Sequence, residues 1–216
     1  MTVFIERKFI ALHREDWVKR GVDILFSFLM LVLLFPVYFM IAVAIKCSSR
    51  GPVFYSSIRA GKEGKIIKCY KFRTMCMDAE VRLKKILEDP AYLREWEKYS
   101  KLKEDPRVTK IGKWLRKTSL DEMPQFWNVL KGDLSVVGPR PYLMEEVVQH
   151  LGMKKEKILS VRPGITGLWQ TSGRNLLTFE ERISLEATYI DVRSFMLDLK
   201  LIYKTIPLVI RAKGAY

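Results

Sequence analysis

GVDILFSFLMLVLLFPVYFMIAVAI, residues 21–45, is a long apolar run on which the architecture of this chain depends. It carries a single charge, Asp23, and a continuous helix of this length, rising ~1.5 Å per residue, could cross a bilayer. The run is too long for the apolar core of a secretory signal, and no small-residue cleavage site follows it. The sequence therefore predicts a membrane segment that stays in the mature protein.

Two features of this apolar run favour a re-entrant hairpin over a plain spanning helix. Pro36 lacks a backbone donor and clashes with the carbonyl group of Val32, so we expect a kink at Phe35-Pro36. Basic residues also stand at both ends, whereas the positive-inside rule would put them on one side. A helix-break-helix that enters and leaves one leaflet would keep both ends in the cytoplasm, although proline also occurs in plain spanning helices. The basic flanks are Arg14, Lys19, Arg20, Lys46, Arg50, Arg59 and Lys62.

The overall composition is that of one apolar anchor on a polar body. Of the 216 residues, 49% are hydrophobic and 29% are charged, which excludes both a disordered chain and a polytopic membrane protein. The net charge of +14 would concentrate phosphates and acidic lipids, and nucleic acid is the rival partner. Three cysteines without a CxxC pair indicate a reducing compartment and therefore a cytoplasmic body.

A β-hairpin is predicted directly after the anchor. Residues 52–61 and 65–75 are rich in β-branched and aromatic side chains and flank the turn Gly61-Lys62-Glu63-Gly64. Lys71 and Arg73, two positions apart, would share one face of the second strand and could line a polyanion site. The alternative is a solvated basic edge strand, and this pair alone favours that alternative.

Most of the remaining chain has helical patterning. Residues 78–88 and 91–103 predict surface helices, separated and followed by Asp-Pro dipeptides. Residues 194–214 form an amphipathic run with scattered basic residues that could lie against lipid. The predicted fold class is α+β and mainly helical, with a re-entrant helix-break-helix, a small β-hairpin and amphipathic interfacial helices around the site.

The densest group of reactive side chains lies in residues 114–133. Ser119-Leu-Asp-Glu122 matches a capping box, which would place Asp121 and Glu122 in a first helical turn, where the macrodipole keeps both ionised. Adjacent helix positions differ by ~100° in direction, so the two acids could divide two tasks, nucleophilic attack on phosphorus and Mg²⁺ binding. Arg116 could supply further positive charge.

Two later segments add candidate phosphate contacts. Arg140 lies between two prolines, which stiffen its backbone and suit it to bidentate phosphate binding, the alternative being a rigid loop with an exposed arginine. Residues 161–175 carry glycines at 164, 167 and 173, which would let backbone amides approach a ligand or would simply build a structural loop.

Together these segments resemble the bacterial sugar transferases, monotopic polyprenol-phosphate phosphoglycosyl transferases that begin exopolysaccharide, O-antigen and glycoprotein glycan assembly. The resemblance covers nearly the whole chain and is closest to a small form, because larger relatives carry extra membrane helices and a further domain before this core. It implies an N-terminal segment with the re-entrant helix over 1–48 and a catalytic domain over 49–216, on the cytoplasmic face of the bacterial inner membrane. The motifs that carry it are YKFRTM at 70–75, LRKTSLDEMPQFWNVLKGDLSVVGPRP at 115–141, VRPGITGLWQTSGRN at 161–175 and LDLK at 197–200.

The resemblance also implies a chemistry for the acidic pair. Asp121 would attack the sugar-bearing phosphorus of a UDP-sugar, expel UMP and pass the phosphosugar to polyprenol (undecaprenyl) phosphate. Glu122 would bind Mg²⁺ and Asp198 would be a supporting acid. At the membrane kink the family commonly has Ser-Pro, whereas this chain has Phe35-Pro36 and no serine hydroxyl there to satisfy the freed backbone groups. The expected phosphate-binding cations are Lys71, Arg73, Arg116, Arg140 and Arg174, with Arg73 added by the strand pattern.

The expected partners follow from the same resemblance. They are a UDP-sugar, polyprenol phosphate and membrane lipids, and residues 172–182 look more like members that use UDP-glucose or UDP-galactose than those that use acetamido sugars. The alternative function is a membrane-anchored basic module that binds nucleic acid or anionic lipid without catalysis. No recognisable nucleic-acid motif is present, so nucleic acid is not expected, and a homodimer is left open.

Overall fold

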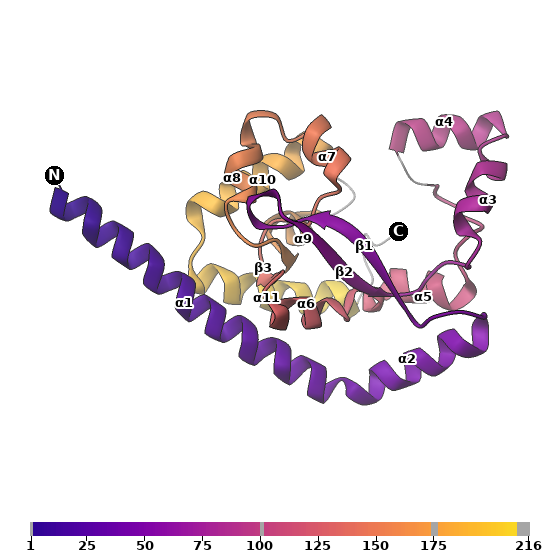
Figure 1. The fold of residues 1–216 in the computed structure, drawn as a ribbon, viewed down its shortest axis with the longest axis horizontal. Coiled ribbons are helices and arrows are strands. Elements are labelled where there is room, and N and C mark those ends of the chain that lie inside the picture. The colour runs from indigo at the N-terminus through magenta and orange to yellow at the C-terminus, as the bar shows by residue number, and fades with distance from the viewer. Residues whose placement is uncertain (1, 100–101, 174–176, 211–216) are drawn as a thin grey trace.

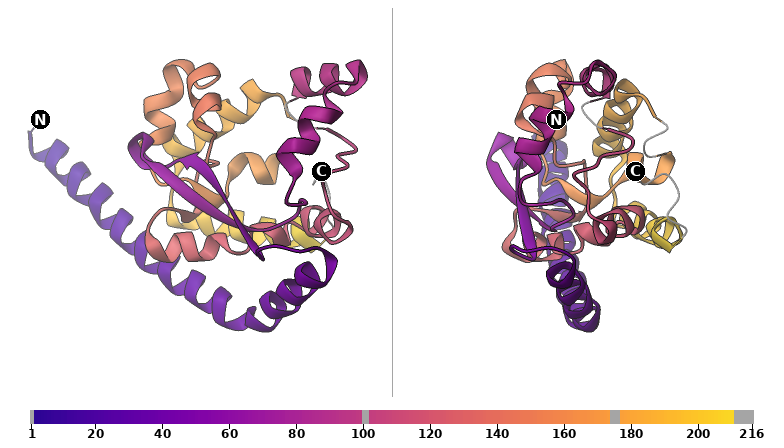
Figure 2. Two further views of the ribbon diagram at one scale, coloured as in Figure 1. Left: turned by 45° about the vertical axis from the view of Figure 1, so that its right-hand side comes forward. Right: turned by 90° about the vertical axis from the view of Figure 1, so that its right-hand side faces the viewer.

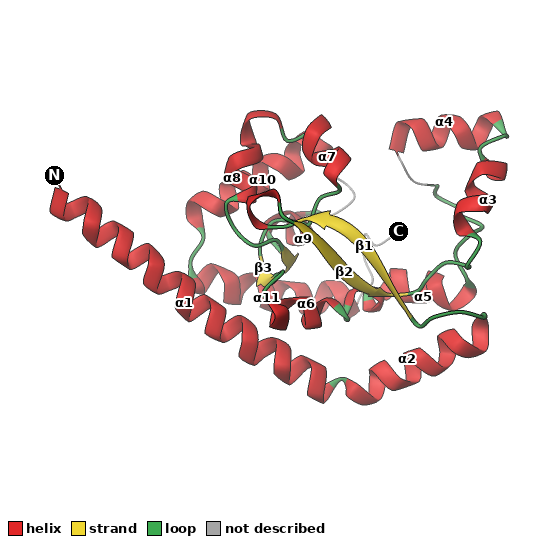
Figure 3. Cartoon of the chain, in the orientation of Figure 1, coloured by secondary structure: helices red, strands yellow, loops and turns green. Residues whose placement is uncertain are grey.

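The computed structural model describes the backbone of residues 2–99, 102–173 and 177–210, and the side chains of 17–97, 102–173 and 177–209. Most of the described chain is helical, and two small two-stranded sheets lie among the helices (Figure 3). The predicted α+β class with a helical majority is therefore confirmed.

The apolar run folds as a bent pair of helices, α1 (Thr2–Leu33) and α2 (Phe35–Ser48). They meet at Leu34 with a bend of 59°, next to the predicted kink. Pro36 lies in the first turn of α2, where a missing N–H group removes no helical bond. The Leu34 amide still donates to Met30, and Tyr38 donates to Leu34 (3.1 and 2.9 Å), so the bend needs no serine hydroxyl. No single described helix is long and apolar enough to cross a membrane, whereas the bent pair taken together is.

The two helices form a V, and the rest of the protein lies on its open side (Figures 1 and 2). α1 packs on α6 (Gln125–Lys131) and on β3 (Ser135–Val137), and α2 packs on α5 (Lys110–Thr118). Many large apolar side chains of the V remain exposed, which is a larger apolar surface than soluble proteins usually present. They include Leu25, Phe28, Leu29, Val32, Leu33, Phe35, Phe39, Met40 and Val43.

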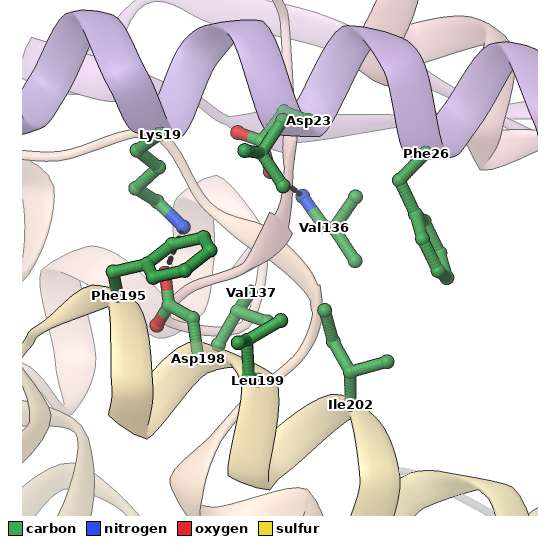
Figure 4. A pocket seen from close by; sticks show the side chains of 10 residues that line it. Lys19, Asp23, Phe26, Val136, Val137, Phe195, Asp198, Leu199 and Ile202 are labelled. Atoms are coloured by element: carbon green, nitrogen blue, oxygen red, sulfur yellow. Dashed lines mark hydrogen bonds and ion pairs between the residues drawn. The ribbon is translucent and has the colours of Figure 1, made fainter.

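Asp23, the single charge of the apolar run, is buried against the body. Its carboxylate accepts hydrogen bonds from the Ser135 hydroxyl (2.7 Å) and the Val136 amide (3.1 Å). Figure 4 shows Asp23 and Lys19 projecting from α1 toward β3 and α11 (Phe195–Ile210). The Asp23 carboxylate, the single charge of the apolar run, thus joins α1 to β3 through two hydrogen bonds.

The predicted hairpin is present as the antiparallel strands β1 (Phe54–Ala60) and β2 (Ile66–Phe72). Their register places Tyr55 opposite Lys71 and Arg59 opposite Ile67, so Arg59 and Lys71 share one face. β2 ends at Phe72, before Arg73. The Arg73 amide still donates to the Val53 carbonyl group (2.8 Å), beside the last strand pair. The Lys71 ammonium group pairs with Glu122, whereas the Arg73 guanidinium binds backbone carbonyl groups after α2, so the predicted common polyanion site for these two side chains is wrong.

A second, parallel sheet of β3 (Ser135–Val137) and β4 (Gly164–Thr166) was not predicted. It brings the two glycine-containing loops together in the core, where a Cβ atom on Gly164 would lie 2.1 Å from the Gly138 nitrogen. A Cβ atom on Gly167 would lie 2.4 Å from the Gly138 carbonyl oxygen. These glycines therefore allow two backbone segments to approach each other, which is the structural alternative for this loop.

Short helices complete the body. α3 and α4 correspond to the predicted surface helices and project from one side of the molecule (Figures 1 and 2). α10 and α11 pack on α9, and α11 also packs on β3 and β4. The bounds are α3 Ala79–Ile86, α4 Pro90–Tyr99, α5 Lys110–Thr118, α6 Gln125–Lys131, α7 Met144–Gln149, α8 Lys155–Leu159, α9 Leu168–Ser172 and α10 Phe179–Val192, with 3₁₀ turns at Lys62–Gly64, Leu120–Glu122 and Gly152–Lys154.

Candidate active site

Asp121 and Glu122, the acidic pair, lie in the 3₁₀ turn between α5 and α6. Ser119 ends α5 in the left-handed conformation, with φ of 58°, and its side chain makes no capping hydrogen bond. The acids do lie in a first helical turn, but the predicted capping box is wrong, because the left-handed Ser119 ends α5 and its hydroxyl does not cap the 3₁₀ turn that follows. The hydroxyl that caps a helix here is that of Thr109, which accepts from the Gly112 amide (3.0 Å) at the start of α5.

Cations from three separate elements surround the acidic pair. Lys71 of β2 donates to Oε1 of Glu122 over 2.6 Å. Arg140, which follows β3, and Arg59 of β1 also interact electrostatically with Glu122, and Arg116 of α5 does so with Asp121. The hairpin, α5 and the loop after β3 therefore converge on one centre of mixed charge.

Burial and these cations move the pKa values of the two acids in opposite directions. Asp121 is only 9% exposed, and burial, with the nearby charge of Glu122, raises its pKa to about 6 against the pull of Lys71 and Arg116. Burial also tends to raise the pKa of Glu122, but Lys71 and Arg140 together outweigh it and lower that pKa to about 2. The helix macrodipole was expected to set both charge states. In the structure, burial dominates the pKa of Asp121, and the nearby cations dominate the pKa of Glu122.

The guanidinium groups of Arg116 and Arg73 lie in different parts of the protein. The Nε of Arg116 donates to the Thr74 hydroxyl (3.0 Å), which holds its guanidinium near Asp121, and burial lowers the pKa of Arg116. Arg73 is buried and donates to the carbonyl oxygens of Ser49 (2.8 Å) and Arg50 (2.6 Å), just beyond the end of α2. The polar atoms of Arg73 are therefore engaged at the junction with the helix pair.

Arg140 lies against an aromatic platform. Its guanidinium is 5.6 Å from the centre of the buried Trp169 ring, and the guanidinium of Arg182 is 5.0 Å from the same ring. The Arg140 backbone amide donates to Glu186 over 2.6 Å. The sequence pattern alone did not mark Trp169, Arg182 or Glu186.

Signals for some of the missed residues are visible once the structure is known. Arg59 could have been found from the hairpin register, which puts it on the face of Lys71. Arg182 and Glu186 are four positions apart on α10 and therefore share a helix face, but no local pattern marks that face as part of a site.

Asp198 and Arg174 complete the predicted set. Asp198 accepts from Lys19 of α1 (2.5 Å) and from the Tyr189 hydroxyl (2.8 Å), beside a small, mostly apolar cavity between α1, β3 and α11 (Figure 4). Asp198 thus links α11 to α1 through Lys19 and to α10 through Tyr189. Arg174 lies outside the described residues.

The carboxylates near the acidic pair limit how the expected magnesium ion could be bound. Within the described ranges, no three His, Cys, Asp or Glu side chains cluster closely enough to hold a metal. Mg²⁺ commonly uses one or two carboxylates and completes its shell with substrate phosphates and water. Glu122, ionised and 34% exposed at its side chain, fits that limited role.

Lysine and arginine side chains grouped around two carboxylates, of which Asp121 is buried and Glu122 is partly exposed, form a site suited to phosphate groups. The family model described as bacterial sugar transferase matches residues 14–212, and the chain belongs to this family. The resemblance drawn from its motifs is thereby confirmed.

Relatives in the family are similar over nearly the whole chain. An undecaprenyl-phosphate galactose phosphotransferase of Salmonella typhimurium is 41% identical over 209 residues, covering 96% of this chain and 43% of the relative. The exopolysaccharide production protein ExoY of Sinorhizobium fredii is 40% identical, covering 92% of this chain and 88% of the relative. A UDP-glucose:undecaprenyl-phosphate glucose-1-phosphate transferase of Klebsiella pneumoniae is 41% identical over 92% of this chain and 41% of its own length. The chain therefore spans less than half the length of two of these relatives and most of the third.

Proposed function

We propose that this protein transfers a sugar 1-phosphate, glucose or galactose 1-phosphate, from a UDP-sugar to undecaprenyl phosphate and releases UMP. The names of the Salmonella and Klebsiella relatives state this class of reaction for galactose and glucose. The observation that carries the proposal is the acidic pair, with one buried acid of raised pKa and one ionised partner among Lys71, Arg116 and Arg140.

In the proposed reaction Asp121 is the nucleophile. A pKa of about 6 leaves about nine-tenths of the group ionised at pH 7, yet makes it more basic than an ordinary aspartate. One carboxylate oxygen attacks the sugar-bearing phosphorus, and the bond from that phosphorus to the bridging oxygen breaks, its electron pair leaving with UMP. An oxygen of undecaprenyl phosphate then attacks the same phosphorus, and the bond to Asp121 breaks, which restores the carboxylate.

The surrounding cations lower the cost of bringing an anion to an anion. Arg116 and Arg140 would contact phosphate oxygens, and Lys71 would fix the orientation of Glu122. Glu122 would hold Mg²⁺, which when bound neutralises phosphate charge. The buried position of Asp121 would exclude water that could otherwise hydrolyse the acyl phosphate bond between Asp121 and the phosphosugar.

The same proposal includes a location for the protein at the cytoplasmic membrane. The bent helix pair would enter and leave the cytoplasmic leaflet of the bacterial inner membrane, with the polar domain and the active site on the cytoplasmic side. Its exposed apolar side chains support this, as do Met196, Tyr203 and Ile206, which are exposed on α11. Labels at Thr2 and Ser48 are then expected to react only from the cytoplasm, and labelling from opposite sides would contradict the re-entrant arrangement.

The decisive experiment is a UMP-release assay with the purified, detergent-solubilised protein. UDP-glucose, UDP-galactose and acetamido UDP-sugars would be supplied with undecaprenyl phosphate, with Mg²⁺ or with EDTA. Release is expected with the hexose donors and Mg²⁺, together with a phosphohexose adduct on the Asp121 peptide by mass spectrometry. Asp121→Asn should abolish both signals, while Asp191→Asn, in an exposed ion pair, should retain them. Unchanged turnover in Asp121→Asn would overturn the proposal.

A further inference from the structure

Glu186 is a buried carboxylate that the proposed chemistry does not use. It lies on α10 with 1% of its surface exposed. One oxygen accepts the backbone N–H of Arg140 (2.6 Å), and the other accepts the hydroxyl of Tyr142 in a very short hydrogen bond. Burying a carboxylate is costly, and both oxygens are engaged on one short loop.

The loop that Glu186 holds is the one that presents Arg140. Arg140 and Tyr142 flank Pro141, and the Tyr142 carbonyl accepts the Ala60 amide (2.8 Å) at the end of β1. The loop is therefore fixed to α10 by a carboxylate and to the hairpin by a backbone hydrogen bond. Since prolines on both sides restrict the backbone of Arg140, its anchored N–H sets where the side chain begins.

The Arg140 guanidinium then reaches two features of the active site. It lies over the Trp169 ring, and it is one of the two strongest electrostatic influences that lower the pKa of Glu122. A loop free to rotate about this position would let the guanidinium move away from Glu122. The geometry thus connects a residue on α10 to the charge around the acidic pair through one arginine.

We propose that Glu186 is a positioning residue that acts through Arg140, holding its guanidinium where it contacts the phosphates of the UDP-sugar. The activity readout rests on the proposed transferase function. The alternative is that Glu186 only contributes to folding, as a buried carboxylate with satisfied hydrogen bonds.

A double-mutant cycle separates these roles. Glu186→Met leaves the Arg140 N–H without its acceptor and is expected to raise KM for UDP-galactose roughly 10-fold, with a smaller change in kcat. Arg140→Ala is expected to weaken donor binding at least as much. If Glu186 acts through Arg140, Glu186→Met should have no further effect in the Arg140→Ala background. Multiplicative effects of the two changes would overturn the proposal.

Two milder variants keep the test valid if Glu186→Met folds poorly. Glu186→Gln retains a carbonyl oxygen for the Arg140 N–H and can donate its amide to the Tyr142 oxygen, so KM should stay within about 3-fold of the wild type. Tyr142→Phe removes one hydroxyl and leaves the contact to Arg140, so it too should change KM little. Glu180→Gln, an exposed change on the same helix, is the matched control. A KM for Glu186→Gln raised as far as that of Arg140→Ala would contradict the proposal.

A second readout does not depend on turnover. Inorganic pyrophosphate binding, measured by calorimetry, should weaken roughly 10-fold in Glu186→Met and show the same non-additivity with Arg140→Ala. If the wild type releases no UMP but binds pyrophosphate with this pattern, the transferase proposal fails while the role of Glu186 stands. If pyrophosphate binding is absent, or is unaffected by both single changes, the positioning role is overturned.

Discussion

The ammonium group of Lys71 lies 2.6 Å from Oε1 of Glu122, and this ion pair joins the β-hairpin to the turn that carries the acidic pair. Lys71 also acts electrostatically on Asp121, where it limits the rise in pKa that burial causes. One lysine therefore contributes to the charge state of both acids. The separation of their pKa values depends on a contact between residues 51 positions apart in the chain.

The pH dependence of turnover should report Asp121. A nucleophilic carboxylate is inactive when protonated, and the pKa of Asp121 is raised to about 6. Below that pH, kcat should fall about 10-fold per pH unit, and above it the rate should be level until another group titrates. UMP release measured from pH 4.5 to 8 tests this, and a rate that stays constant down to pH 5 would contradict it.

Removing the charge of Lys71 should shift that profile. Without the cation both carboxylates are harder to ionise, so the acid limb in Lys71→Met should move to higher pH, and the rate at pH 7 should fall about 10-fold or more. Lys68→Met, an exposed lysine of the same strand, is the control and should keep the wild-type profile. An unshifted limb in Lys71→Met would mean that Lys71 does not tune the acids.

Ser119 should be replaceable by glycine but not by a β-branched residue. Its φ of 58° lies in the left-handed region, which glycine enters freely and valine strongly avoids. Ser119→Gly should retain turnover, while Ser119→Val should destabilise the fold by about 1–2 kcal/mol and lower turnover by displacing the acidic pair. Thermal unfolding alongside the release assay tests both, and equal behaviour of the two variants would argue against a conformational requirement.

Asp23 should contribute to stability although it lies in the apolar run. In Asp23→Leu the Ser135 hydroxyl and the Val136 amide lose their acceptor in a buried place, at a cost of about 1–3 kcal/mol. Asp23→Asn keeps one acceptor oxygen and should lose less. Thermal unfolding in detergent measures the difference, and a stabilising effect of leucine would show that apolar character outweighs the anchor.

Glu186 should make the folded state less stable as pH rises. Burial raises the pKa of Glu186 from an ordinary 4.5 to about 7, so the folded protein binds this proton more tightly than the unfolded chain. The stabilisation is complete below pH 4.5 and is lost as pH rises through 7, a change of about 3 kcal/mol from this group. Glu186→Gln should remove this component from the pH dependence of unfolding, and an identical dependence in both proteins would exclude it.

Local patterns in the sequence predicted the bent helix pair, the hairpin and the acidic pair, but not the parallel β3–β4 sheet. The proline within the apolar run predicted the bend between α1 and α2, and β-branched segments around Gly61–Gly64 predicted the hairpin. Asp121 and Glu122 are consecutive residues, so they are close together whatever the fold. The family resemblance implied that Lys71, Arg116 and Arg140 contact phosphate, and the fold brings all three close enough to act electrostatically on the acidic pair.

The failures share one physical origin. The Ser119 capping box was wrong because the same four residues fit a helix start and a helix end, and α5, which packs on α2 and on the turn of the acidic pair, ends there. Arg73 was assigned to phosphate because its strand position suggested a shared face with Lys71, but its guanidinium binds the carbonyl oxygens after α2.

The apolar segments, the bend in the chain and the pair of neighbouring acids can all be read from short stretches of sequence, because each depends on residues close together in the chain. The cations that face those acids, the depth at which Asp121 is buried and the carboxylate that holds the Arg140 loop become known only from the folded arrangement. Burial and ion pairing fall off within a few ångströms, so they depend on contacts between distant segments that no local pattern encodes.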